Sequence, residues 1–240
     1  MGGRPIPPEP RRRRGKGGRL LACALASAAL GCASFLTGGE ISDATIAAGL
    51  KDALEVGTRS AVAIASRKGG YSDDPRLRIG LPDSLDKPAK GLRVLGFSDQ
   101  LDELELAMNR AAEEAAGQAA PVFAEAIARM TFTDARATLE GGDSAATEYF
   151  ERATRSELES RFEPIIGEKM GRVGVVQRYD QLLSRYRSLP FTQSPSLDIR
   201  RYVTDRALDG LFVVLAEQER MIRTDPAART TALLKQVFGP

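Results

Sequence analysis

The amino-acid sequence predicts an all-α protein, an irregular bundle of about seven to nine helices in a single domain. Apolar residues recur mostly three or four positions apart, which is the spacing of one face of a helix. Ser, Thr or Asp precedes these segments and Gly or Pro follows them, as expected for helix starts and stops. No two alternating apolar segments are joined by the turn residues of a β-hairpin, and the sequence contains no internal repeat.

The first 31 residues are expected to be an export signal that is removed from the mature protein. A basic stretch (residues 11–19) precedes an apolar stretch (residues 20–30), and Gly31 and Cys32 follow. This order is typical of a signal peptide, and the apolar stretch is too short to span a membrane. Residues 32–41 are then a short tether, and residues 42–239 form the all-α domain.

Two modes of cleavage fit the end of this signal. In the first, Cys32 becomes the first mature residue and carries a lipid, so that the protein is anchored to a membrane and faces the periplasm. In the second, an ordinary signal peptidase uses the small residues Ala29 and Gly31, and the protein is soluble in the periplasm. We favour the lipid anchor because the chain is poor in cysteine and yet has Cys32 at this boundary. Its other cysteine, Cys23, lies inside the leader.

Removal of the leader changes the sign of the net charge. The whole chain has a formal charge of +2, whereas residues 32–240 hold 27 basic and 31 acidic residues. Nucleic acid is therefore not an expected partner. Because the mature chain retains one cysteine, it has no internal disulfide and its fold depends on packing.

The first helix is predicted to begin at Ser42 or Asp43 and to end at Gly69-Gly70. Ile46, Leu50 and Leu54 form its apolar face. Beside this face runs a row of small residues, four positions apart, which we call the small-residue ridge: Gly49, Ala53, Gly57, Ala61 and Ala65. Small side chains let another backbone approach closely, so the ridge predicts a buried contact between helices.

Residues 71–82 are rich in Pro, Gly and Asp and predict an ordered connector. The second strong helix is expected to be capped by Ser98 and to carry Leu101, Leu104 and Met108 on its buried face. Pro121 starts or kinks the next segment. Further helices are expected after caps at Thr133, at Asp143 or Ser144, and at Ser156, with Pro164 bending or dividing the last of them. Residues 175–189 are predicted to be helical and residues 190–196 to form a loop.

The last third of the chain has the most regular pattern. A helix is predicted to begin at Asp198 or Thr204 and to end at Asp225-Pro226. Its buried face consists of five apolar residues: Leu208, Leu211, Phe212, Leu215 and Ile222. Pro226 is expected to start a final short helix with Leu233, Leu234 and Phe238.

Several separated strings of the chain resemble one known family. They are MTFTDARATLEGGDSAATEYFERAT (residues 130–154), YVTDRALDGLFVVLAEQERMIR (202–223) and DPAARTTALLKQVFG (225–239), and the shorter GLKDALEVGTRSAV (49–62) and IGLP (79–82). Over roughly residues 43–239 the sequence is similar to an exported, lipoprotein-like bacterial family, domain-of-unknown-function family 4197. The resemblance implies an exported, mostly helical domain, and it implies no activity.

The side-chain inventory argues against most enzyme classes. The chain has no histidine and no mature thiol besides Cys32. Ser-His-Asp and Cys-His systems are therefore excluded, no catalytic residue is assigned, and neither a zinc site nor another cofactor is expected. Carboxylates on predicted helices leave a hydrolase as a weaker hypothesis: Glu103, Glu113, Glu114, Asp205, Asp209 and Glu217. In the alternative interpretation they are exposed and form ordinary ion pairs, such as Asp209 with Arg206 and Glu217 with Arg220.

Binding motifs are few. The cluster of Asp143, Ser144, Thr147 and Glu148 lacks the ligand spacing of a calcium loop and fits a helix start better, so no metal site is predicted. Asn109 and Arg110, on an otherwise Ala-rich helix, are candidates for a ligand contact. The alternative for these two residues is a buried structural hydrogen bond.

The leading functional hypothesis is a non-catalytic interaction or accessory module of the cell envelope, anchored through Cys32 and partnered by an envelope protein. The second hypothesis is a carrier that holds an apolar ligand between its helices. Such a carrier needs a cavity lined by residues such as Leu104, Met108, Phe123, Phe150 and Phe212. The third is the carboxylate-dependent hydrolase described above.

Overall fold

A computed structural model describes residues 42–172 and 198–232, together with residues 177, 179–181, 184, 235 and 237. By its internal contacts the chain divides after Glu40, and the fold below belongs to the unit Ile41–Pro240. The predicted export signal, the tether with Cys32, the loop at residues 190–196 and the apolar residues Leu233, Leu234 and Phe238 lie outside the described residues.

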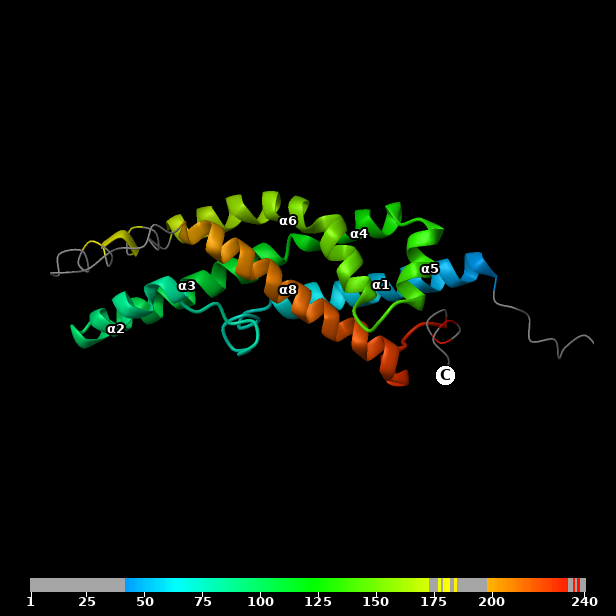
Figure 1. The fold of residues 1–240 in the computed structure, drawn as a ribbon, viewed down its shortest axis with the longest axis horizontal. Coiled ribbons are helices and arrows are strands. Elements are labelled where there is room, and N and C mark those ends of the chain that lie inside the picture. Colours follow the sequence, from blue (N-terminus) through cyan, green and yellow to red (C-terminus); the bar gives the residue numbers. More distant parts are fainter. Residues whose placement is uncertain are drawn as a thin grey trace, which may run out of the picture. The chain divides into compact units, whose positions relative to one another are not determined.

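The described residues form seven α-helices and two 3-10 turns and contain no β-strand, which confirms the predicted all-α class (Figure 1). The helices are α1 (Asp43–Ser66), α2 (Asp86–Val94), α3 (Ser98–Ala116), α4 (Ala119–Arg129), α5 (Phe132–Glu140), α6 (Ala145–Arg172) and α8 (Ile199–Thr224). The 3-10 turns are η1 (Asp83–Leu85) and η2 (Pro226–Ala228).

Helix α8 is the element around which the others pack, and it contacts α1, α3 and α6 (Figure 1). It begins at Asp198, the first of the two predicted positions, because the Asp198 carboxylate accepts hydrogen bonds from the N–H groups of Arg200 and Arg201. Its buried side chains run along its whole length, from Ile199 to Ile222. A helix with buried residues on several sides suits a central position, since each side can face a different neighbour.

Helix α1 packs its small-residue ridge into the interior, as predicted. Ser42 caps the helix by accepting a hydrogen bond from the N–H of Thr45. Ala61 and Ala65 are fully buried, and a Cβ atom placed on Gly57 would lie 3.5 Å from Ile222 Cδ1 of α8. The ridge therefore lets α1 and α8 pack closely. Helices α4 and α5 contact α1 as well.

The aromatic residues of the interior come from three helices. Phe123 of α4 packs edge to face with Phe150 of α6 at 5.5 Å and with Phe212 of α8 at 6.3 Å between ring centroids. Offset aromatic pairs of this kind add about 0.5–1.5 kcal/mol to the stability from burial alone. The alanine row of α3 reaches the same interior, where Ala111 and Ala115 have no exposed surface.

Two predicted helix caps are wrong by one or two residues. Phe97, not Ser98, precedes the first turn of α3, and no side chain caps it. Thr131, not Thr133, caps α5 and forms a reciprocal capping box with Asp134. The hydrogen bonds from Thr131 lower the pKa of the Asp134 carboxyl below its ordinary value. Both errors concern helix ends, where several polar residues compete for the same position.

Helix α6 is one continuous helix, so the predicted new start at Ser156 is wrong and Pro164 does not divide it. A proline inside a helix costs about 3 kcal/mol, because it removes a hydrogen bond and crowds the preceding turn. Leu158, Phe162 and Ile166 are fully buried on both sides of the proline. Their packing offsets that cost, which local sequence rules do not include.

The sequence pattern missed η1 and α2. Pro88 is the third residue of α2, where its missing N–H would have no partner inside the helix. Leu85 and Leu92 are buried, and α2 packs on α3. A short helix whose partner is the next helix along the chain leaves only a short periodic signal in the sequence.

We expect substitution of the small-residue ridge to destabilise the protein. Gly57→Leu introduces a side chain where α8 is already in contact, Ala61→Leu introduces one at a fully buried position, and overpacking of this kind costs about 1–3 kcal/mol. The measurement is urea unfolding followed by circular dichroism at each variant. Ala63→Leu on the exposed side of α1 is the matched control and should leave the unfolding free energy within about 0.5 kcal/mol of wild type. Equal stability of Ala61→Leu and Ala63→Leu would contradict the packing of α1 on α8.

Candidate functional site

The chain between α1 and η1, residues 67–82, forms an ordered turn that side chains of α3 and α8 hold in place. Gly69 has a positive φ of 88°, and a Cβ atom on Gly70 would lie 2.4 Å from the carbonyl oxygen of Ala65. These two positions therefore require glycine. The predicted connector is thus a fixed structure, and it forms one wall of a groove that α8 also lines.

Glu113 of α3 binds the start of this connector. Its buried carboxylate accepts hydrogen bonds from the backbone N–H groups of Gly69, Tyr71 and Ser72 at 3.1, 3.3 and 3.4 Å. Arg110 Nη1 lies 2.6 Å from the second carboxylate oxygen. The carboxylate thus compensates backbone donors that the turn leaves without partners. Its role is to fix the connector on α3.

Asn109 holds the other end of the connector. Its side-chain oxygen accepts a hydrogen bond from the N–H of Ile79 at 2.8 Å, and its amide nitrogen donates to the carbonyl of Ile79 at 2.9 Å. The same nitrogen donates to the carbonyl of Glu105 at 2.7 Å. The two candidate ligand contacts, Asn109 and Arg110, thus both bind other groups of the same chain.

Two tyrosines join the connector to α8. The buried hydroxyl of Tyr71 donates to the carbonyl of Ala207, and burial raises the pKa of this phenol above its ordinary value. Gly210 makes room for the ring, because a Cβ atom there would lie 2.7 Å from Tyr71 Cε1. Tyr202 donates from its hydroxyl to the carbonyl of Gly80 at 3.0 Å.

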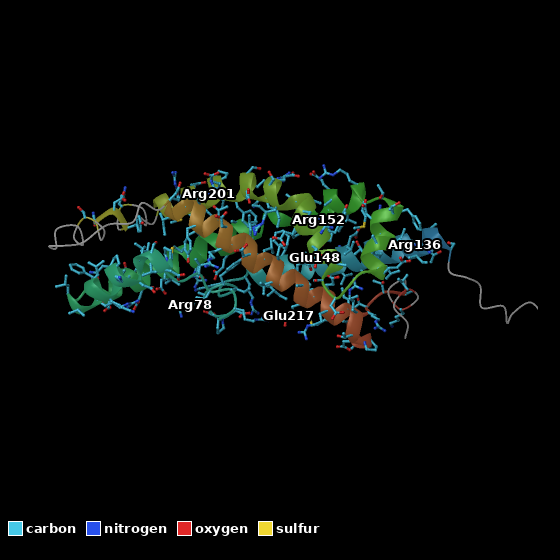
Figure 2. The ribbon with its side chains drawn as sticks, in the orientation of Figure 1. Arg78, Arg136, Glu148, Arg152, Arg201 and Glu217 are labelled. Atoms are coloured by element: carbon cyan, nitrogen blue, oxygen red, sulfur yellow. The ribbon has the colours of Figure 1, made fainter. Side chains whose placement is uncertain are left out.

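Between the connector and α8 lies an open groove of about 390 Å³, which we call the connector groove. It is lined by Arg76, Leu77, Arg78, Ile79, Gly80, Leu81 and Asp83 on one side and by Tyr202, Arg206, Asp209, Gly210 and Val213 on the other. Figure 2 labels Arg78 and Glu217 in this part of the molecule and Arg201 near the first turn of α8. The groove combines three arginines with a partly apolar floor.

The arginines of the groove differ in their partners. Arg76 binds Asp74 at 2.7 Å and Glu217 at 2.9 Å, and this guanidinium lowers the pKa of the Asp74 carboxyl. Arg78 lies 3.3 Å from Glu105 and keeps 57% of its side chain exposed. Arg206 stacks over the ring of Tyr202 at 5.6 Å.

Four of the carboxylates considered for a hydrolase are bound to different basic or backbone partners: Glu113, Glu114, Asp209 and Glu217. Glu113 is buried beside the connector, Glu114 pairs with Lys169, and Glu217 pairs with Arg76. Asp209 forms its ion pair with Arg155 of α6 rather than with Arg206. Asp209 and Glu217 thus pair with arginines of other elements. Arg155 belongs to α6 and Arg76 to the connector.

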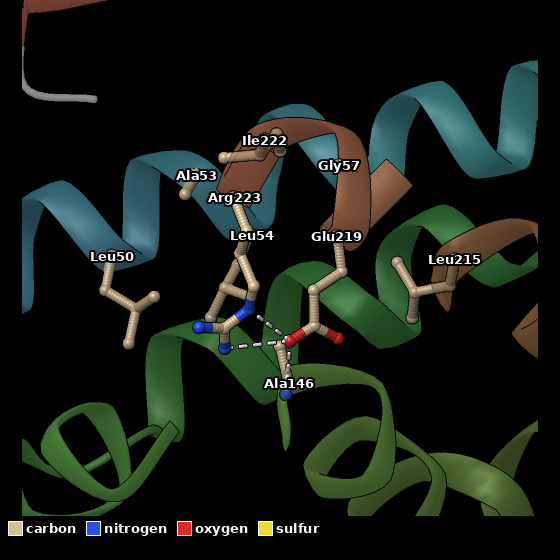
Figure 3. A pocket seen from close by; sticks show the side chains of 9 residues that line it. All are labelled: Leu50, Ala53, Leu54, Gly57, Ala146, Leu215, Glu219, Ile222 and Arg223. Atoms are coloured by element: carbon tan, nitrogen blue, oxygen red, sulfur yellow. Dashed lines mark hydrogen bonds and ion pairs between the residues drawn. The ribbon is translucent and has the colours of Figure 1, made fainter. Parts of the chain in front are cut away.

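The sequence analysis missed Glu219, which lies at the centre of a second buried polar cluster (Figure 3). Its carboxylate accepts hydrogen bonds from the N–H groups of Ala146 at 3.0 Å and Thr147 at 2.8 Å, and from the Thr147 hydroxyl at 2.8 Å. Arg223 binds the same carboxylate at 2.9 Å and donates to the carbonyl of Thr138 at 2.8 Å. One ion pair of α8 thus binds the first turn of α6 and the last turn of α5.

The cavity beside this pair is small. Its volume is about 30 Å³, and Leu50, Leu54 and Leu215 are among its lining residues (Figure 3). That volume has room for about one or two water molecules, whereas ligand pockets measure about 300–1,000 Å³. The residues named for an apolar-ligand carrier, Leu104, Met108, Phe123, Phe150 and Phe212, are at most 5% exposed, and the three phenylalanines pack on one another.

The described residues contain neither a candidate metal cluster nor a candidate membrane span. Within residues 42–172 and 198–232 and the other described positions, no group of three or more acidic side chains is placed to hold a metal ion. Ser144, in the cluster considered for a cation loop, donates from its hydroxyl to Glu148 at the start of α6. No helix in the same part of the chain is long and apolar enough to cross a membrane.

A family model described as "Protein of unknown function (DUF4197)" matches residues 40–239. No significant match was found among curated proteins or among solved structures.

We expect Glu219→Ala to be strongly destabilising. It leaves Arg223, whose side chain is 15% exposed, without its carboxylate partner, and it removes the acceptor for the first turn of α6. Loss of one partner of a buried pair costs about 3–5 kcal/mol. The matched control is Glu217→Ala on the same helix, which breaks a more exposed pair with Arg76 and should cost at most about 1 kcal/mol. Unfolding in urea measures both values, and similar costs for the two variants would contradict a structural role of Glu219.

Proposed function

Since the chain belongs to the DUF4197 family, whose function is unknown, we propose that it is a non-catalytic binding module of the bacterial cell envelope, attached to a membrane through an acylated Cys32. The order of a basic stretch, an apolar stretch and Gly31-Cys32 at the start of the chain supports export and lipid attachment. With this topology the α-helical domain faces the periplasm. Its partner is then another component of the envelope.

The observation that carries the non-catalytic part of the proposal is the bonding of the buried carboxylates. Among the described residues, Glu113 and Glu219 are the acidic side chains that are buried. Each accepts at least two backbone hydrogen bonds and forms an ion pair with an arginine. A general acid or base needs a carboxyl group within reach of substrate and able to exchange a proton. Both carboxylates instead compensate helix and turn donors, which is a structural role.

The absence of histidine from the 240 residues supports the same conclusion. Histidine is the residue most often used for proton transfer near neutral pH. The surface of the domain offers ion pairs and an arginine-lined groove, and such surfaces suit recognition of a partner. The apolar-ligand carrier is not proposed, because the residues that would line its cavity pack against one another.

Cys32→Ser should release the protein from the membrane fraction, because the acyl chains can be attached only to the thiol. Cell fractionation and intact-protein mass spectrometry of the mature chain measure this change. Cys23→Ser is the matched control, since Cys23 lies within the proposed leader and should leave both results as in wild type. An unchanged distribution of Cys32→Ser, with no acyl mass on the wild-type protein, would contradict the lipid anchor and favour simple secretion.

A binding module should also carry its partner through mild purification. We expect native mass spectrometry of the wild-type protein, extracted from its own envelope, to detect a second species of defined mass. Detection of the free protein alone, under conditions in which known envelope complexes survive, would contradict the proposal.

A further inference from the structure

Arg206 is an arginine without a carboxylate partner in the part of the chain that the structure describes. Its spacing predicts a pair with Asp209, but that carboxylate is bound to Arg155 of α6. The Arg206 guanidinium instead lies over the Tyr202 ring, with 5.6 Å between its central carbon and the ring centroid. Stacking on the ring restricts the orientation of the guanidinium and leaves its N–H groups available to an acceptor.

The opposite wall of the connector groove is held rigidly. Ile79 is fixed by two hydrogen bonds to Asn109, and the carbonyl of Gly80 accepts a hydrogen bond from Tyr202. Arg78 lies between these fixed positions and Arg76, and more than half of its side chain is exposed. A ligand in the groove would therefore meet two arginines on preformed walls, which reduces the entropy lost on binding.

The charges of the groove favour an anion. Its lining includes Arg76, Arg78 and Arg206, against Asp83 and Asp209, and Asp209 is already paired with Arg155. Arg76 is bound by Asp74 and Glu217, and Arg78 is bound by Glu105 through one nitrogen, so that the donors left for a ligand are those of Arg206 and the remaining N–H groups of Arg78. The arginine of the lining that has no carboxylate partner among the described residues is Arg206, and its charge is the one that an anion would neutralise.

We propose that the connector groove binds a phosphate group, with Arg206 and Arg78 as its hydrogen-bond donors. Guanidinium groups match phosphate oxygens in pairs, and a phosphate ester can engage two arginines at once. The volume of about 390 Å³ also accommodates a small organic group beside the phosphate, next to the half-buried Leu81 and the exposed Val213. The proposal builds on the proposed binding function and names the chemistry of the partner. The phosphate can belong to a soluble ester or to the headgroup of a phospholipid.

The test compares two arginines of α8. The full chain carrying Cys32→Ser serves as the parent, so that no acyl group contributes to binding. Binding of inorganic phosphate and glycerol 3-phosphate is measured by calorimetry, and vesicle binding by sedimentation with phosphatidylcholine, alone or mixed with phosphatidylglycerol. Arg206→Gln should weaken binding of at least one phosphate probe by about tenfold or more. Addition of Arg78→Gln to this variant should weaken binding further.

Arg201→Gln is the matched control, because Arg201 is exposed on the same helix and lies outside the groove lining. It removes the same charge and should leave the affinity within about twofold, as expected for a weak long-range effect. Arg206→Lys should recover part of the affinity, since the charge remains while the paired donors are lost. Circular dichroism of each variant checks that the fold is retained.

Each outcome decides the proposal. Binding of the soluble probes that depends on Arg206 supports a soluble phosphate ester, and binding restricted to phosphatidylglycerol vesicles with the same dependence supports a lipid headgroup. Absence of binding to every probe, or an equal loss in Arg206→Gln and Arg201→Gln, overturns the proposal. The acyl mass on Cys32 is measured separately, so that failure of the phosphate site and failure of the membrane anchor are distinguishable.

Discussion

The buried ion pair between Glu219 and Arg223 is the interaction on which the corner between α5 and α6 depends. Glu219 accepts hydrogen bonds at the positive end of α6, and Arg223 donates to carbonyls at the negative end of α5. Each charge thus lies where the helix dipole favours it. Burial of a charged pair is costly in general, and backbone partners at both helix ends offset that cost. The pair also explains why α8 lies against this corner, because a single turn of α8 provides both side chains.

A second set of polar contacts holds the connector, and it has the same logic. Glu113 and Asn109 of α3 bind backbone groups at the two ends of the connector, while Tyr71 and Tyr202 link it to α8. A segment without regular secondary structure leaves many backbone groups without partners, and buried side chains must supply them. The result is a loop that hydrogen bonds to α3 and α8 hold in one conformation. This rigidity is what turns an ordinary surface depression into a groove with fixed walls.

The two sets of contacts divide the polar residues of the domain into those that maintain the fold and those that remain available. Glu113, Glu219 and Asn109 belong to the first group, although each resembles a catalytic or ligand-binding residue when considered alone. Arg206 and Arg78 belong to the second group, because both side chains are exposed, Arg206 lies over the Tyr202 ring, and Arg78 binds Glu105 through one nitrogen only. A binding function based on arginine therefore agrees better with the structure than a hydrolytic function based on carboxylates.

The sequence by itself determined the helical class, the burial of the small-residue ridge and, to a choice of two positions each, the starts of α1 and α8, because these depend on residues within one or two turns of each other. The tertiary structure decided which carboxylate pairs with which arginine. Asp209 has Arg206 three positions away, yet its partner is Arg155, 54 positions distant. Glu219 binds Ala146, 73 positions distant. Such choices depend on how the helices pack, and the spacing of residues along one helix holds no information about the helix that lies beside it.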